Sequence, residues 1–312
     1  MIKALFNILI FPGIFFLFAF AFVSEFVDRK ICARLQNRIG PPWFQPLADF
    51  IKLLGKEDIM PGAADKAIFK FMPVVALTAT ITAFFYIPLW SKEALFYFKG
   101  DVIVVLYLLT IPTLTFFLGG WYSRSVYSMI GAVRALIQLF AYEVPLFMTI
   151  LASSLLANTW SRTEMAQFYS GHPWLWLLNL IGFAIALISL LGKLERTPFD
   201  IPEAETEIVA GAFTEYSGRL LALFRICIDV EMVVGASLLA AVFFPFWLGA
   251  GPVIGFIIYL GKVLFIVALI SVLRSVFARL RLDQMINLCW KCFAPIALVQ
   301  VIINLILKWI IY

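Results

Sequence analysis

Histidine is nearly absent from this chain, and charged residues are scarce. One histidine occurs among 312 residues, and 14% of the residues are charged. A chain with so few charges does not have the surface of a soluble protein. The single histidine, His172, stands beside Pro173 at the expected start of a helix. We expect it at the surface, which argues against a histidine-based metal site.

Cysteine is also too sparse for a metal cluster. Cys289 and Cys292 form one CxxC motif, and Cys32 is expected on the same side of the membrane. A single CxxC is a weak signal, because an iron–sulfur cluster needs four thiolates. A Ser/His/Asp constellation, a phosphate-binding glycine loop and a nucleotide fingerprint are missing as well. We therefore expect a chain with no metal, no cofactor and no catalytic centre of its own.

The abundant residues are apolar. Hydrophobic residues make up 63% of the chain and the mean hydropathy is +0.99, which is typical of a membrane protein that crosses the bilayer several times. The N-terminal apolar run continues to about Val27 without a small-residue cleavage site and is expected to be a retained span. We predict an all-α membrane protein with one domain, residues 1–312. Its eight spans lie near residues 4–27, 68–90, 102–122, 134–157, 173–192, 219–246, 253–273 and 291–311.

The basic residues gather on one side of these spans. The connections 28–67, 123–133, 193–218 and 274–290, with their flanking residues, hold sixteen Lys and Arg, and the other connections with both termini hold five. The positive-inside rule places the first group in the cytoplasm and both termini outside. The net charge of +5 is explained by this clustering, since no basic stripe with interleaved aromatics indicates nucleic-acid binding. We expect a location in the cell membrane.

The first cytoplasmic loop is the longest. It opens with basic residues, and Gly40, Pro41 and Pro42 are expected to end the helix that carries them. After Pro46, apolar residues repeat at helical spacing, which predicts an amphipathic helix lying in the membrane interface. A plain connecting helix fits this spacing equally well. The length and charge of the loop favour a docking surface for a partner.

The segment from Glu195 to Arg219 holds six of the nineteen acidic residues, between two apolar runs. Pro202 suits a first helical position, which predicts a short helix from Pro202 to about Gly211. Glu203 and Glu207 then share a face, and like charges this close cannot all stay ionised at low cost if water is excluded. A store of protons is one interpretation, and an ordinary solvated loop is the other.

Acids also occur inside the spans. Glu143 lies near mid-membrane in the fourth predicted span, where a charge costs about 2.5 to 3.5 kcal/mol. Pro145 leaves a helix carbonyl without its usual donor nearby, which is compatible with a proton relay or with a structural hydrogen bond between helices.

The sixth predicted span carries Arg225, Asp229 and Glu231. Arg225 and Asp229 are four residues apart and can pair, whereas Glu231 points elsewhere and has no partner near it in sequence. Glu231 is therefore the better relay candidate of the two acids. Lys262 in the seventh span lies too deep to reach the membrane surface easily and should face protein or water.

Four segments resemble one family: FVDRKICARLQNRIGPP, QPLADFIKLLGKE, RALIQLFAYEVPL and ERTPFDIPEAETEIVAGAFTEYSG. They are similar to the membrane subunit of respiratory complex I that joins its peripheral and membrane arms, and to the counterparts in energy-converting membrane-bound [NiFe] hydrogenases and sulfur reductases. The resemblance covers nearly the whole chain. It implies cytoplasmic loops that seat an iron–sulfur small subunit and a NiFe-type large subunit, with iron–sulfur clusters and the NiFe site in those partners, and antiporter-like subunits in the membrane.

By motif, the resemblance assigns an ion path and a docking surface. The acids that the motifs assign to the path are Glu143, Asp200, Glu203, Glu205, Glu207 and Glu215. Three further residues are added because they lie inside predicted spans: Asp229, Glu231 and the basic Lys262. The docking residues are Arg29, Arg34 and Arg38. The short segment from Gly40 to Gln45 and the Asp28 before the basic pair look like the hydrogenase branch and not the quinone-reducing branch.

The resulting hypothesis is a non-catalytic subunit that couples electron transfer in a peripheral module to H⁺ or Na⁺ translocation in a hydrogenase-type complex. The alternative with the same fold is the quinone-site subunit of a complex I-like oxidoreductase. A stand-alone secondary transporter is a different class, but it predicts inverted repeats that we do not find. A purely structural anchor would not explain why the acids Glu143 and Glu231 lie inside predicted spans.

Overall fold

The structure, a computed structural model, describes residues 2–90, 94–172, 174–246 and 251–311, and all the regular secondary structure in these ranges is helical. No strand occurs in those ranges, which confirms the predicted all-α class. The long helices are α2 (Ile14–Leu35), α4 (Lys66–Phe85), α5 (Asp101–Tyr122), α6 (Val126–Leu156), α11 (Gly218–Phe243), α12 (Pro252–Val276) and α14 (Ala294–Ile311).

Seven helical stretches are long and apolar enough to cross a membrane. The first combines part of α1 (Ile2–Leu9) with α2, and the last runs through α13 (Leu282–Leu288), a π-helical turn (Cys289–Phe293) and α14. The predicted span 173–192 differs from the others. It consists of the one-turn α8 (Leu175–Leu178) and the 14-residue α9 (Leu180–Lys193), which is shorter than the roughly 20 residues a full crossing needs.

Two predicted helix bounds are wrong. Helix α2, which carries the first basic residues, ends at Leu35 and not at Gly40. Asn37 adopts a left-handed conformation with φ of 58° and so stops the helix. The fourth span begins at Val126 and not at residue 134. Residues 126–133 are predicted to belong to the connection before the span, because Arg134 is interpreted as the residue that flanks it.

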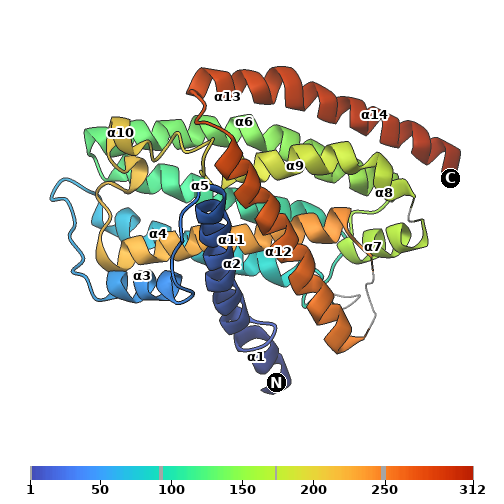
Figure 1. The fold of residues 1–312 in the computed structure, drawn as a ribbon, viewed down its shortest axis with the longest axis horizontal. Helices are drawn as coiled ribbons and strands as arrows, with labels where there is room; N and C mark the ends of the chain where they lie inside the picture. Colours follow the sequence, from blue (N-terminus) through green and yellow to red (C-terminus); the bar gives the residue numbers. More distant parts are fainter. Residues whose placement is uncertain (1, 91–93, 173, 247–250, 312) are drawn as a thin grey trace.

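The helices form a bundle with two different ends (Figure 1). The short helices α3 (Gln45–Leu54) and α10 (Glu205–Ile208) lie at the left end in that view, and α7 (Arg162–Gly171) and α8 lie at the right end with the C-terminus. We call the end with α3 and α10 the acidic end, because it holds the acidic segment 195–215. Helices α2 and α12 cross the other long helices at a steep angle (Figure 1).

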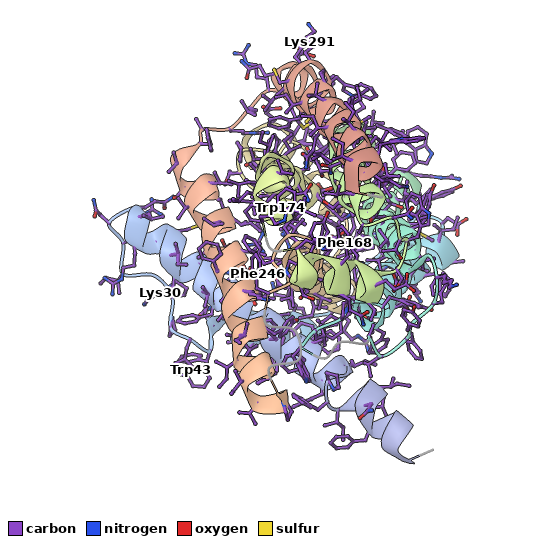
Figure 2. All side chains as sticks on the ribbon, turned by 90° about the vertical axis from the view of Figure 1, so that its right-hand side faces the viewer. Lys30, Trp43, Phe168, Trp174, Phe246 and Lys291 are labelled. Atoms are coloured by element: carbon purple, nitrogen blue, oxygen red, sulfur yellow. The ribbon has the colours of Figure 1, made fainter. Side chains whose placement is uncertain are left out.

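Helix α11 forms the centre of the bundle. In its most apolar window 89% of the residues are buried, against 17% in the window of the last span. It packs against α2, α4, α9 and α12. Figure 2 looks at the bundle from the side of α7 and α8 and shows the interior filled by side chains, with Lys30, Trp43 and Lys291 at its edges. Polar residues in the middle of α11, such as Glu231 and Ser237, are therefore held among other helices and not exposed to lipid.

Candidate functional site

A chamber of about 870 Å³ opens at the acidic end. Its walls come from α2, α3, α11, α12 and the segment between Leu194 and Ala204. The lining includes five arginines (Arg29, Arg196, Arg225, Arg274, Arg279) and six acids (Glu25, Asp49, Glu195, Asp200, Glu203, Asp229). So many ionisable groups around one space favour a hydrated chamber over one that excludes water.

Arg196 is the central cation of this chamber. Its guanidinium bonds Glu25 on α2 at 2.6 Å, pairs with Asp229 on α11 at 3.4 Å, and bonds Asp28 on α2. Asp28 is fully buried and also pairs with Arg274 on α12 at 2.6 Å. One arginine thus ties the start of the acidic segment to two helices, and the neighbouring acids raise its pKa against the lowering effect of burial.

The three predicted docking residues are placed differently from one another. Arg29 points inward, since it bonds Glu25 at 2.7 Å and Asp49 on α3 at 2.8 Å. Arg34 and Arg38 are exposed at the acidic end. The structure therefore leaves Arg34 and Arg38 accessible to another protein and uses Arg29 to hold α3 against α2.

The acidic segment is not a single helix from Pro202 to Gly211, as the sequence predicted. Only Glu205–Ile208 forms an α-helical turn, followed by a 3₁₀ turn at Gly211–Phe213. Gly211 has a positive φ of 53°, and a side chain there would meet the Pro202 carbonyl at 1.7 Å. This fold-back of the chain replaces the continuous helix.

Because Glu203 precedes the helical turn, it does not stack with Glu207 as predicted. Glu203 pairs with Arg225 at 2.9 Å and Glu207 with Arg134 at 2.6 Å. Asp200 pairs with Arg279 at 3.2 Å. The hydrogen bond from Arg134 is the main cause that lowers the pKa of Glu207. Arginines from α6, α11 and the segment after α12 thus neutralise these acids, so mutual repulsion does not store protons on Glu207.

Two more predicted acids belong to the same segment. Glu215 is half-buried between the 3₁₀ turn and α11, and within the described ranges its carboxyl has no hydrogen bond or ion pair. Glu205 begins α10, but its side chain lies outside the described residues.

Glu195 is almost fully buried, unlike the other acids of this segment whose side chains the structure describes. It is 5% exposed, and burial raises its pKa well above the usual 4.5, with further increases from the negative charges of Glu203 and Glu231. Lys193 and Arg225 oppose this shift without cancelling it. Glu195 is one of the six acids of the segment, but it was not predicted to belong to the ion path.

A pH experiment tests the state of Glu195. Its pKa is raised in the folded protein, so the folded state holds the proton more tightly than the unfolded state does, and stability falls as pH rises above about 4.5. Glu195→Gln mimics the protonated form. We expect its melting temperature to equal the wild type at low pH and to exceed it increasingly at higher pH. Parallel melting curves at every pH would contradict this.

Beyond Glu195 lies a buried ion pair that the sequence did not indicate. Lys193, the last residue of α9, pairs with Glu231 of α11 at 2.8 Å, and their side chains are 2% and 0% exposed. The ammonium also donates to the Leu109 carbonyl on α5 and lies 5.9 Å from the centre of the Tyr142 ring. Glu231 is thus inside the protein with a partner that is distant in sequence.

The predicted pair within α11 does not form. Arg225 turns to Glu203 and Asp229 to Arg196. An i,i+4 ion pair stabilises a helix by only about 0.2 to 0.5 kcal/mol. The partners that other elements offer around the chamber therefore decide how the Arg225 and Asp229 side chains are oriented.

Glu143 lies just past the midpoint of the 31-residue α6 and is half-buried. Among the described residues, no hydrogen bond or ion pair joins its carboxyl, and Lys193 is the charged group that acts on it. Lys262 lies elsewhere. It donates to the Phe244 carbonyl at 2.6 Å and to the Phe246 carbonyl, beyond the end of α11 that is remote from the chamber. The structure thus groups Glu143 with Glu231 and separates Lys262 from both.

In the described ranges, no group of three or more His, Cys, Asp or Glu is arranged so that it could hold a metal ion. Cys289 is buried and Cys292 is exposed, on the π-helical turn before α14. Cys32 contacts the Ser271 carbonyl and Asp28.

The fold and the site define a class: a helical membrane protein with a charged chamber at one end and buried acids leading inward from it. A family model described as NADH dehydrogenase matches residues 7–305. The chain therefore belongs to this NADH dehydrogenase family, in which its curated relatives are the H-type subunits of NADH-quinone oxidoreductases.

The relatives are similar along most of their length. The chain is 35% identical over 320 residues to the H-type subunit of the NADH-quinone oxidoreductase of Bacillus thuringiensis, covering 97% of this chain and 95% of the relative. It is 34% identical over 304 residues to the corresponding subunit of Deinococcus deserti, covering 89% and 77%. A solved chain of the membrane-bound sulfane sulfur reductase, an archaeal respiratory membrane complex, superimposes with a TM-score of 0.85 at 28% identity, covering 97% of this chain and 98% of the other.

Proposed function

We propose that this chain is the non-catalytic coupling and anchoring subunit of a membrane-bound respiratory complex of the hydrogenase or sulfur reductase type. It links electron transfer in a peripheral module to translocation of H⁺ or Na⁺. Two comparisons support this: the structural neighbour belongs to a sulfane sulfur reductase complex, and the curated relatives are subunits of oxidoreductases.

The observation that carries the proposal is the series of buried charges leading from the chamber. Glu195 lines the chamber, and its carboxyl is influenced by Glu231 and Lys193. Lys193 in turn acts on Glu143 inside the bundle. Buried ionisable groups are costly and mark ion or proton paths in membrane proteins. A redox-driven change at the chamber can therefore alter charges deep in the membrane.

The acidic end is the proposed docking site for the peripheral module. Arg34 and Arg38 are exposed there, beside Ile39 and Trp43, which are 80% and 75% exposed. Exposed apolar and basic residues together are typical of a partner interface. We propose that an iron–sulfur small subunit and a NiFe-type large subunit dock here and carry the cofactors, and that antiporter-like subunits pack against the helices.

The topology follows from this docking. The acidic end faces the cytoplasm and both termini lie outside, in the cell membrane. Helices α8 and α9 together supply the eighth crossing, with their short length completed by the loops of the opposite end. Helix α3 exposes Leu47, Ile51 and Leu54 and lies in the membrane interface.

A quinone-site subunit is the second candidate. It is favoured by the names of the curated relatives and by the chamber, whose wall includes the apolar residues Phe22, Phe50 and Leu53 beside its charges. In that case a quinone headgroup would be reduced in the chamber, while the rest of the proposal is unchanged.

Purification of the complex through an affinity tag on this chain tests both candidates. We expect iron–sulfur and nickel-site subunits to co-purify, with turnover on hydrogen or sulfur compounds. Turnover on quinone alone would favour the second candidate. The chain expressed without partners in sealed vesicles should show no ion flux under an imposed gradient, and measurable flux would indicate a stand-alone transporter.

A further inference from the structure

Lys193 is a buried cation in the series of charges that leads from the chamber to Glu143. Its side chain is 2% exposed at the end of α9. A buried ammonium is costly, and pairing with Glu231 only partly offsets that cost. Well-packed apolar residues often serve a purely structural purpose as well as a buried ion pair does, so the position of this pair needs another explanation.

The position of Lys193 is intermediate between the chamber and Glu143. Leu194 and Glu195, the next two residues, line the chamber. On the inner side, Lys193 pairs with Glu231, donates to the Leu109 carbonyl and lies over the ring of Tyr142, the neighbour of Glu143, at 5.9 Å from the ring centre. One side chain from α9 therefore faces α5, α6 and α11 at the point where they meet.

The charged groups around Lys193 come from three elements. Glu231 pairs with it from α11 at 2.8 Å, and the lysine charge also acts on Glu143 of α6 and on Glu195, two residues further along the chain. The hydroxyl of Tyr142 is not free, because it shares a hydrogen bond of 3.0 Å with Thr113. Of these three carboxyl groups, only that of Glu231 pairs directly with Lys193 among the described residues, so proton exchange with the other two requires a bridging water or a movement of the lysine side chain.

We propose that Lys193 is a proton-transfer station between the chamber and Glu143, and that the ion carried along this path is H⁺. The proposal rests on the coupling function proposed above and identifies its ion. In the transfer step, an N–H bond of the Lys193 ammonium breaks and an O–H bond forms on the Glu143 carboxylate. The amine that remains takes a new proton from Glu195, which is recharged from the water of the chamber.

Charge balance gives the cycle a direction. When Lys193 has released its proton, Glu231 is left as a buried carboxylate without its counter-ion. That state is unfavourable, so it draws a proton from the chamber back to Lys193. Because Lys193 is paired with Glu231 and, among the described residues, no ion pair joins it to Glu143, the final transfer requires a bridging water or a swing of the long lysine side chain.

Two variants separate a proton carrier from a simple counter-ion. Lys193→Arg keeps the positive charge, but a guanidinium does not release its proton in proteins. The double variant Lys193→Met with Glu231→Gln removes both charges and leaves no unpaired ion, so it should fold even if the larger arginine does not fit. Lys70→Arg, at an exposed position of α4, is the matched control.

The measurement uses the whole complex in sealed membrane vesicles driven by a reduced dye. Electron transfer, H⁺ uptake with a pH-sensitive dye and ²²Na⁺ uptake are recorded together. We expect both Lys193 variants to keep electron transfer and to lose H⁺ uptake by about tenfold or more, as removal of a proton-transfer group does. The control should match the wild type.

Other outcomes overturn the proposal in distinguishable ways. If either Lys193 variant moves H⁺ at the wild-type rate, Lys193 is only a counter-ion and the coupling function stands. If the wild type takes up ²²Na⁺ in the presence of a protonophore and at the same rate in both variants, the ion is not H⁺, and coupling again stands. A wild-type complex that transfers electrons and moves no ion overturns the coupling function together with this inference.

Discussion

Glu143→Gln is expected to abolish ion translocation while electron transfer to artificial acceptors continues. The carboxyl lies inside α6, without a bonded partner among the described residues and under the influence of Lys193. An amide has nearly the same shape but cannot accept and release a proton. Ion uptake should therefore fall by about tenfold or more, as it does when a general acid or base is removed. Dye-detected ion uptake in vesicles, divided by the electron-transfer rate, gives the result.

Glu164→Gln provides the control for this variant. Glu164 is an exposed acid on α7 at the opposite end, where it accepts hydrogen bonds from Thr159 and Tyr97. It lies away from the chamber and from the Lys193–Glu231 pair. The ratio of ions moved to electrons transferred should be unchanged in this control. An unchanged ratio in Glu143→Gln would remove Glu143 from the path.

The fold was predictable because its signals are local. Long apolar runs identify the seven described helical stretches that are long and apolar enough to cross a membrane, and Gln45–Leu54 is helical where apolar residues repeat at helical spacing. The 14-residue α9 was harder to predict, since the apolar run continues through Asn179, where the helix breaks. The left-handed Asn37 that ends α2 is likewise a feature of a single residue. Periodicity does not detect either break.

The acids of the site were predictable, and most of their partners were not. Glu143 and Glu231 attract attention because charges are rare inside apolar spans. Their relation to Lys193 depends on how α9 packs against α6 and α11, which no local pattern in the sequence reports. Glu25 and Asp28 lie at the end of the first apolar run, just before its basic residues. They could have been selected in the same way as Glu143, because they too are charged residues in or beside an apolar span. Arg196 also carried a signal, as the only base within the acidic segment before Arg219.

Arg196→Met is expected to lower stability more than any other single substitution in the chamber. The guanidinium contacts Glu25, Asp28 and Asp229, and its side chain is only 9% exposed. Removing one partner of a buried ion pair typically costs about 3 to 5 kcal/mol, because the remaining charge stays buried and unpaired. The variant should yield little assembled complex, with a clearly lowered melting temperature in detergent.

The cause of that loss can be separated from lost packing by a rescue. If unpaired charge is the cause, adding Glu25→Gln and Asp28→Asn to Arg196→Met should restore part of the lost stability, because neutral amides cost less to bury than carboxylates. If the bulk of the arginine is the cause, the triple variant should be no better than the single one. Arg219→Met is the control, since Arg219 is 68% exposed and bonds Asp58 at the protein surface. A control that falls as far as Arg196→Met would contradict the central role of Arg196, because an exposed pair contributes little to stability.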